Sequence, residues 1–164
     1  MDPLQVGENV FEGFMKVRSG ELMGMILKVS EDEKTLEIEH TFKRTTPYSE
    51  FTRCFDNNDI RWAVLNFRFN VAEGGKRDKL VWIAWSPDTL HRKSPRETCR
   101  LKMSVMTAPS EFLKNPIVSK KSVAFLQANG PDDIVAESVL SKVSKFERDP
   151  VVPSSVLSFI NGQL

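Results

Sequence analysis

Residues 76–89 read Lys-Arg-Asp-Lys-Leu-Val-Trp-Ile-Ala-Trp-Ser-Pro-Asp-Thr, and this stretch decides the fold. Its middle, residues 80–85, is apolar at six successive positions, so a strand here has no polar face. A strand that is apolar on both sides needs cover on both sides, which predicts a central strand in a sheet flanked by helices. The basic turn before this strand would hold its charges toward a partner, and the Ser-Pro-Asp-Thr sequence ends it.

The composition is that of an ordinary globular chain. Its 164 residues suit one domain with a sizeable core. The formal net charge of +1 argues against a general nucleic-acid-binding protein, because such proteins carry a clear basic excess. No apolar run approaches the roughly 18 residues that a membrane-spanning helix needs, so we expect no transmembrane segment. Any electropositive site must therefore be local.

The sequence carries no pattern typical of an enzyme. Cys54 and Cys99 lack metal or redox spacing, which favours a reduced, cytosolic protein. His40 and His91 lie far apart in sequence, and the Gly-Gly pair at 74–75 lacks the lysine and serine or threonine of a phosphate-binding loop. The N-terminus lacks the basic and apolar regions of a signal peptide. We therefore expect a non-enzyme with no cofactor, no metal and no cleaved leader.

The rest of the chain predicts alternating helices and strands. Apolar spacing and turn residues place the helices and strands as follows. Helices are expected at residues 10–17, 46–55, 100–112 and from 131 onward, and strands at 24–29, 35–42, 61–69, 80–85 and 122–128. This order predicts a single α/β (α+β) domain whose mixed five-stranded sheet has helices on both faces.

Two details of these elements follow from local chemistry. Thr46 is expected to cap the second helix, with Pro47 at its first helical position. Pro131 is expected to open the last helix. The expected buried stripe of that last helix is Val135, Val139, Val143 and Phe146.

Residues 35–42 show the alternation of a half-buried strand. Leu36, Ile38 and His40 are expected on one face of it. Glu37 and Glu39 are then expected on the other face.

Four segments in this order resemble the actin-depolymerising factor/cofilin family. They are Gly75-Lys76-Arg77-Asp78-Lys79 leading to Trp85-Ser86-Pro87-Asp88-Thr89, then Lys102-Met103, then Leu126-Gln127-Ala128-Asn129, and finally Ser138-Val139-Leu140-Ser141-Lys142-Val143-Ser144-Lys145. The resemblance covers roughly residues 6–146. It implies an ADF-homology domain over residues 1–148 and a C-terminal tail over residues 149–164.

The resemblance also implies two actin-binding surfaces. In this family, one surface binds monomers and filaments through the N-terminal segment and a long helix. The matching residues here are Leu4, Val6, Arg100, Lys102, Met103 and Lys114. The other surface binds filaments only, and its matching residues are Arg77, Lys79, Lys142 and Lys145. Each basic residue also has a simpler interpretation, as a solvated hairpin charge or as a cation at a helix C-terminus.

The implied function is that of a cofilin-type protein. It would be a monomer of the cytoplasm and cytoskeleton that binds filamentous and monomeric actin and promotes severing and depolymerisation. Two departures keep other functions open. The long helix reads Val-Met-Thr-Ala-Pro-Ser-Glu at residues 105–111, where relatives have Tyr-Ala-Ser-Ser-Lys-Asp-Ala, and the loop at 90–98 is longer than usual. A coactosin-like protein that binds actin without severing, or a glia maturation factor-like protein that binds the branching complex, is therefore an alternative.

Two further segments carry open alternatives. The loop at 90–98 is either an exposed insertion, an extra actin contact, or a phosphoinositide-binding site in a protein that has lost actin binding. Its basic residues are Arg92, Lys93 and Arg96. The tail is apolar at Val156, Leu157, Phe159 and Ile160, and we expect it to dock on the domain rather than fray or bind a partner.

Overall fold

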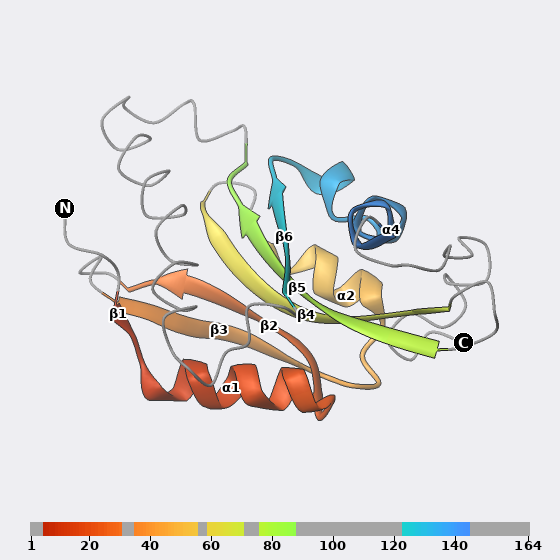
Figure 1. Ribbon diagram of the computed structural model, residues 1–164. Helices are drawn as coiled ribbons and strands as arrows, with labels where there is room; N and C mark the ends of the chain where they lie inside the picture. Colours follow the sequence, from red (N-terminus) through yellow and green to blue (C-terminus); the bar gives the residue numbers. More distant parts are fainter. Residues whose placement is uncertain (1–4, 31–34, 56–58, 71–75, 88–122, 145–164) are drawn as a thin grey trace.

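The computed structural model describes residues 5–30, 35–55, 59–70, 76–87 and 123–144 (Figure 1). The expected long helix at 100–112, the loop at 90–98 and the tail at 149–164 lie outside these residues. The elements, in order, are β1 Gln5–Val6, α1 Glu8–Ser19, β2 Leu22–Val29, β3 Thr35–Lys43, α2 Tyr48–Arg53, β4 Arg61–Asn70, β5 Lys76–Trp85, β6 Val123–Ala128, the 3-10 helix η3 Pro131–Asp133 and α4 Ala136–Ser144.

The described strands form one mixed sheet in the order β1-β3-β2-β4-β5-β6. The pairs β3–β2, β2–β4 and β4–β5 are antiparallel, while β6 runs parallel to β5. These five long strands confirm the predicted five-stranded mixed sheet. The two-residue β1 joins it at one edge, parallel to β3.

Helices cover both faces of this sheet, as predicted (Figure 1). On one face, buried side chains of α2 and α4 pack against alternate residues of β4 and β5, and we call this cluster the α2/α4 core. On the other face, buried side chains of α1 pack against the remaining alternate residues, and we call this cluster the α1 core. β5 contributes Val81, Ile83 and Trp85 to the α2/α4 core. It contributes Leu80 and Trp82 to the α1 core, so both its faces are buried.

A β-bulge in β3 changes which side chains share a face. Ile26 of β2 pairs with His40, but the next residue, Leu27, pairs with Ile38, so Glu39 is the extra residue. The bulge moves His40 onto the face of Phe42, whose ring lies 6.1 Å from the His40 ring and belongs to the α2/α4 core. The expectation that His40 shares a face with Leu36 and Ile38 is therefore wrong, because strict alternation stops at a bulge.

The second helix begins one residue later than predicted. Pro47 is the N-cap, with φ −61° and ψ 140°, and no side chain caps the helix. Thr46 instead donates its backbone N–H to the carbonyl of Lys43 in a turn. Tyr48 and Phe51 are buried in α2, and Phe55 is buried just beyond it.

The last helix also begins later than predicted. Pro131 opens the short η3 rather than α4, and α4 itself begins at Ala136. Val135 therefore lies before α4 and is 40% exposed, so its place in the buried stripe was wrong. Val139 and Val143 are buried as predicted, together with Leu140. Phe146 lies outside the described residues.

Candidate functional site

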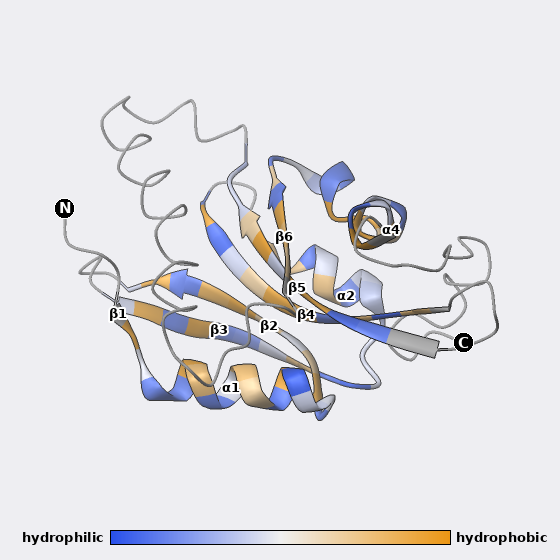
Figure 2. Ribbon diagram, in the orientation of Figure 1, coloured by the Kyte–Doolittle hydropathy of each residue, from blue (hydrophilic) through white to orange (hydrophobic). Residues whose placement is uncertain are grey.

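The start of β5 carries the basic residues of the expected filament-only surface. Figure 2 shows β5 changing from hydrophilic near its start to hydrophobic along its length. Lys79 pairs with Phe67, and Arg77 pairs with Phe69. Because cross-strand partners share a face, Lys79 projects to the side of the α2/α4 core, where Phe67 is buried. Lys79 is half-buried, and the side chain of Arg77 lies outside the described residues.

The last turn of α4 carries the second basic position on this side. Lys142 is half-buried, while Val139 and Val143 on the same helix are buried in the α2/α4 core. Lys142 also complements the negative C-terminal end of the helix. The fold therefore puts Lys79 and Lys142 on the same side of the sheet. Lys145 lies outside the described residues.

A buried tyrosine fixes the approach to α4. The Tyr48 hydroxyl donates a hydrogen bond of 2.6 Å to the carbonyl of Ile134, just before α4. The Tyr48 ring lies 5.7 Å from the Phe51 ring and 6.4 Å from the Phe67 ring. Burial, with a smaller contribution from the charge of Glu137, raises the pKa of Tyr48 well above its usual range. Tyr48 therefore ties α2 and β4 to the residues that lead into α4.

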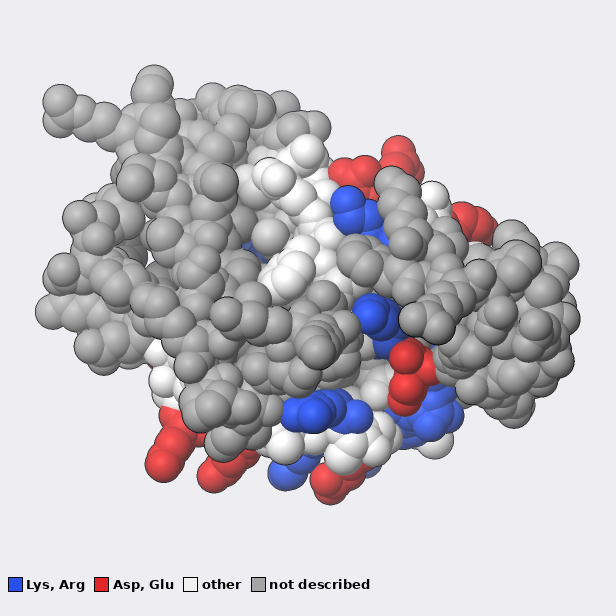
Figure 3. Space-filling model, viewed as in Figure 1, with Lys and Arg blue, Asp and Glu red and all other residues white. Residues whose placement is uncertain are grey.

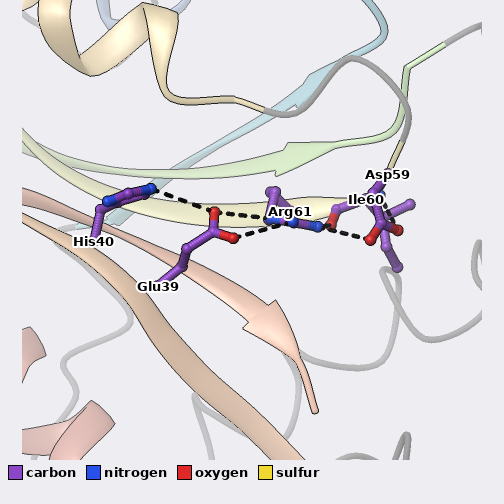
Figure 4. Close-up of polar contacts among 5 residues, drawn as sticks. All are labelled: Glu39, His40, Asp59, Ile60 and Arg61. Atoms are coloured by element: carbon purple, nitrogen blue, oxygen red, sulfur yellow. Dashed lines mark hydrogen bonds and ion pairs between the residues drawn. The ribbon is translucent and has the colours of Figure 1, made fainter. Parts of the chain in front are cut away.

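The opposite end of the β4–β5 ladder holds a group of charges that sequence reasoning missed. Figure 4 shows His40, Glu39, Arg61 and Asp59 in a row. The Arg61 guanidinium donates to both carboxylate oxygens of Glu39, at 3.0 and 3.1 Å. It also lies 2.9 Å from a carboxylate oxygen of Asp59 and donates to the carbonyl of Ile60 at 2.8 Å. Nε2 of His40 lies 3.8 Å from Glu39.

This charge group ties β3 to β4 across the intervening β2. Burial opposes the charge on Arg61, yet its hydrogen bonds to Glu39 and Asp59 outweigh that effect and raise its pKa. Each charged group here is matched by another, so the arrangement is typical of a structural ion pair rather than of an acid–base site. The one signal of this ion pair in the sequence was Arg61 itself, an arginine at the first position of an apolar strand. The bulge at Glu39, which brings the carboxylate to Arg61, was not foreseeable from the sequence.

The expected monomer/filament surface is described at one residue only. Val6 lies in β1, pairs with Leu36 and packs, partly buried, against the α1 core. Its visible role is therefore to join the sheet edge to the core. The following predicted site residues lie outside the described residues: Leu4, Arg92, Lys93, Arg96, Arg100, Lys102, Met103 and Lys114.

Charges on the described surface are mixed. In the view of Figure 3, Lys and Arg side chains are interspersed with Asp and Glu side chains over the described part of that face. Among the described residues, no group of three or more His, Cys, Asp or Glu side chains could hold a metal ion. No helix in the same residues is long and apolar enough to cross a membrane.

Comparison with known proteins gives a consistent result. A family model described as cofilin/tropomyosin-type actin-binding protein matches residues 3–144. The chain is 28% identical to cofilin of Yarrowia lipolytica over 141 residues, which cover 85% of this chain and 86% of that one. It is 31% identical to cofilin-1A of Dictyostelium discoideum over 85 residues, or 52% of this chain. This last match spans about three-fifths (61%) of the length of the Dictyostelium protein.

Solved structures share the fold. Cofilin of Streptomyces griseoflavus matches with a TM-score of 0.69 at 21% identity, covering 87% of this chain and 98% of that chain. Coactosin of Entamoeba histolytica matches with a TM-score of 0.66 at 20% identity, covering 89% and 98%. At this identity the likeness shows the fold alone, and cofilin and coactosin are matched almost equally well.

Proposed function

This chain belongs to the cofilin/ADF family of actin-binding proteins, and we propose from this that it binds the sides of actin filaments, binds actin monomers, and promotes severing and loss of subunits. The domain would span residues 1–148, consistent with the family match to residues 3–144, with a tail at 149–164. It would act by binding, without a catalytic step, in the cytoplasm and cytoskeleton where its relatives work.

The observation that carries this proposal is the placement of Lys79 and Lys142. Lys79 lies in β5 and Lys142 lies 63 positions later, in α4, yet both belong to the side of the sheet covered by the α2/α4 core. The family binds filaments through these two elements. We propose that these residues, with Arg77 and Lys145, form the filament-only surface, where basic side chains face acidic groups of actin. The monomer/filament surface would use Leu4, Val6, Arg100, Lys102, Met103 and Lys114.

Severing would follow from selective binding. A protein that binds one filament twist more tightly than another shifts the filament toward the preferred twist. Boundaries between bound and bare stretches then join subunits of different twist. The protein needs no chemistry for this, only a difference in affinity between the two states of the filament.

The test is co-sedimentation with filamentous actin, read together with filament length by fluorescence microscopy. We expect the protein in the pellet, more actin in the supernatant, and shorter filaments. Absence of the protein from the pellet over the full range of filament concentrations would contradict actin-filament binding. A matched control uses the same protein denatured by heat and cleared by centrifugation.

A coactosin-like function is the second candidate. The altered sequence at 105–111 favours it. It predicts binding to filaments with unchanged filament length and no rise in supernatant actin. A glia maturation factor-like protein would instead bind the branching complex and leave bare filaments unbound.

A phosphoinositide-binding function rests on Arg92, Lys93 and Arg96. Flotation with vesicles that contain or lack phosphoinositides separates it from the others. Binding to those vesicles together with failure to bind filaments would favour this function over the actin-binding one.

A further inference from the structure

Arg44 holds an unusual position at the end of α1. It follows β3 directly, and its guanidinium lies against Gly20, whose φ of 87° ends α1; a Cβ added at Gly20 would be 3.4 Å from Nη1 of Arg44. Both terminal nitrogens of Arg44, Nη1 and Nη2, are buried, and neither has a hydrogen-bond partner in the part of the chain that the structure describes. A buried cation without a partner is unfavourable, because it has left water and gained no acceptor in exchange.

The end of α1 does not satisfy this guanidinium. Carbonyls at a helix C-terminus are the usual acceptors for a nearby cation. Here the Val17 carbonyl already accepts from the backbone N–H of Gly20 at 3.1 Å and from Nδ2 of the buried Asn66 at 2.9 Å, so both its lone pairs are used. Glu21, the acid next to Gly20, is exposed, and no described carboxylate forms an ion pair with Arg44. Within the described fold, the charge of Arg44 is therefore unmatched.

Arg44 lies at the end of the sheet that carries Lys79. Figure 1 shows the end of β3 and the start of β5 on the same side of the molecule. Lys43, the last residue of β3, pairs with Leu22 of β2, and Lys79 pairs with Phe67 of β4. Extending the β2–β4 register by two residues puts Leu22 opposite Phe67. Lys43 and Lys79 are then three strands apart, or about 14 Å, so one partner surface of ordinary size can reach both Lys79 and Arg44.

We propose that Arg44 is a further contact residue of the filament-only surface, and that on binding its guanidinium leaves Gly20 and pairs with a carboxylate of actin. This inference rests on the proposed function. An arginine suits the role because its planar guanidinium binds a carboxylate through two parallel hydrogen bonds. Turning outward breaks no hydrogen bond of Nη1 or Nη2 to the described fold, so the new pair replaces no internal one. The free protein then keeps an arginine where an apolar side chain would be more stable, which is a common cost of a binding residue.

Urea denaturation of the full-length protein tests the unmatched charge without actin. Arg44→Met keeps a long side chain beside Gly20 and removes the charge, so we expect a higher denaturation midpoint than in wild type. Arg53→Met is the matched control, because Arg53 is an exposed arginine at the end of α2, and its midpoint should equal that of wild type. A midpoint of Arg44→Met at or below that of Arg53→Met would mean that the fold does satisfy Arg44, and would overturn the proposal.

Co-sedimentation with filamentous actin tests the contact itself. Arg44→Met should bind filaments about fivefold more weakly, the loss expected for one charge pair that keeps some access to water. Because this variant is expected to be more stable than wild type, unfolding would not explain the loss. Lys28→Met removes one positive charge near the other end of β2, where Lys28 pairs with Glu37, and it should bind as wild type does.

The outcomes separate this inference from the proposed function. Wild-type affinity in Arg44→Met, together with weaker binding by Lys79→Glu, would overturn the inference and leave the proposed function standing. Equal losses in Arg44→Met and Lys28→Met would indicate only a general charge effect, and would also overturn it. Absence of filament binding by the wild-type protein would overturn the proposed function and this inference with it.

Discussion

The two ends of the β4–β5 ladder use basic residues in opposite ways. At one end, Arg61 pairs with Trp85 across the strands and is buried, with its charge matched by Glu39 and Asp59. At the other end, Lys79 pairs with Phe67 and stays half-buried on the side covered by α4. The first end holds the sheet together, and the second keeps its charge near the surface.

This difference follows from burial rather than from residue type. A buried cation needs a carboxylate nearby, because removing it from water costs several kcal/mol. A cation that keeps access to water contributes little to stability even when it has a partner. Substitutions at the two ends should therefore change different properties, stability at the end that carries Arg61 and filament affinity at the end that carries Lys79.

Arg61→Ala should lower the free energy of unfolding by about 3 kcal/mol, the low end of the range for breaking a buried ion pair. The low end applies because Glu39 and Asp59 keep partial access to water, with side chains 20% and 42% exposed. Urea denaturation followed by tryptophan fluorescence measures the change. Arg68→Ala is the matched control, because Arg68 lies on the same strand but is exposed.

The control should stay within about 0.5 kcal/mol of wild type, as surface substitutions usually do. If both arginine variants lose the same stability, the ion pair has no special role and the contrast between the two ends is lost. Filament binding by folded Arg61→Ala should remain close to wild type, since its end of the ladder lies away from Lys79.

Lys79→Glu and Lys142→Glu should each weaken filament binding by about tenfold, because each puts a negative charge opposite an acidic partner. Neither should change the free energy of unfolding by more than about 0.5 kcal/mol. Lys16→Glu, on the exposed face of α1, is the control that should bind normally. Co-sedimentation over a range of salt concentrations measures the affinity, and equal losses in all three variants would indicate only a general charge effect.

The sequence predicted the end of the ladder that carries Lys79 better than the end that carries Arg61. The apolar run at 80–85 and its basic start lie on one strand, so their pattern can be read from neighbouring residues. The tie at Arg61 depends on Glu39, 22 residues away, and on a bulge that exists only when β2 and β3 pair. Sequence periodicity carries no signal of a pairing register, so it put His40 on the wrong face.

Helix starts were mispredicted for a related reason. Proline predicted a helix start at both Pro47 and Pro131, and in each case the α-helix begins later. At Pro131 the chain forms η3 first, and the Ser138 hydroxyl donates to the carbonyl of Asp132 across the join with α4. That contact depends on where α4 packs, so proline alone could not distinguish a 3-10 turn from an α-helix.

Tyr48→Phe should lower the free energy of unfolding by about 1 kcal/mol, because it removes one hydrogen bond and leaves the carbonyl of Ile134 without that donor. The variant tests whether this hydrogen bond holds α4 in place at the end of the ladder that carries Lys79. If the bond does hold α4 in place, filament affinity should fall slightly along with the free energy of unfolding. Loss of stability with no change in filament affinity would mean that the position of α4 does not depend on this bond.

The same residue gives the protein a predictable response to alkali. The pKa of Tyr48 is raised in the folded state, so the stability it provides is complete below the unfolded value of about 10 and is lost as pH rises above it. Tyr48 is the only tyrosine in the chain, so tyrosinate absorbance reports it alone. We expect it to ionise together with unfolding, and the Tyr48→Phe variant to lose stability less steeply above pH 10. Ionisation at about pH 10 in a protein that stays folded would contradict the buried position.

His40→Ala should have the smallest effect, below about 0.5 kcal/mol. His40 lies beside the Arg61 tie, but its side chain is 48% exposed and its Nε2 is 3.8 Å from Glu39, and ion pairs with such access to water contribute little. The prediction distinguishes two views of this end of the ladder. If the tie is the bidentate pair of Arg61 and Glu39, removing His40 leaves it intact, and urea denaturation should give nearly the wild-type midpoint. A loss of stability comparable to that of Arg61→Ala would instead mean that the imidazole helps hold the Glu39 carboxylate in position. The stability of this end of the sheet would then depend on the bulge, which carries Glu39 beside His40, rather than on the arginine.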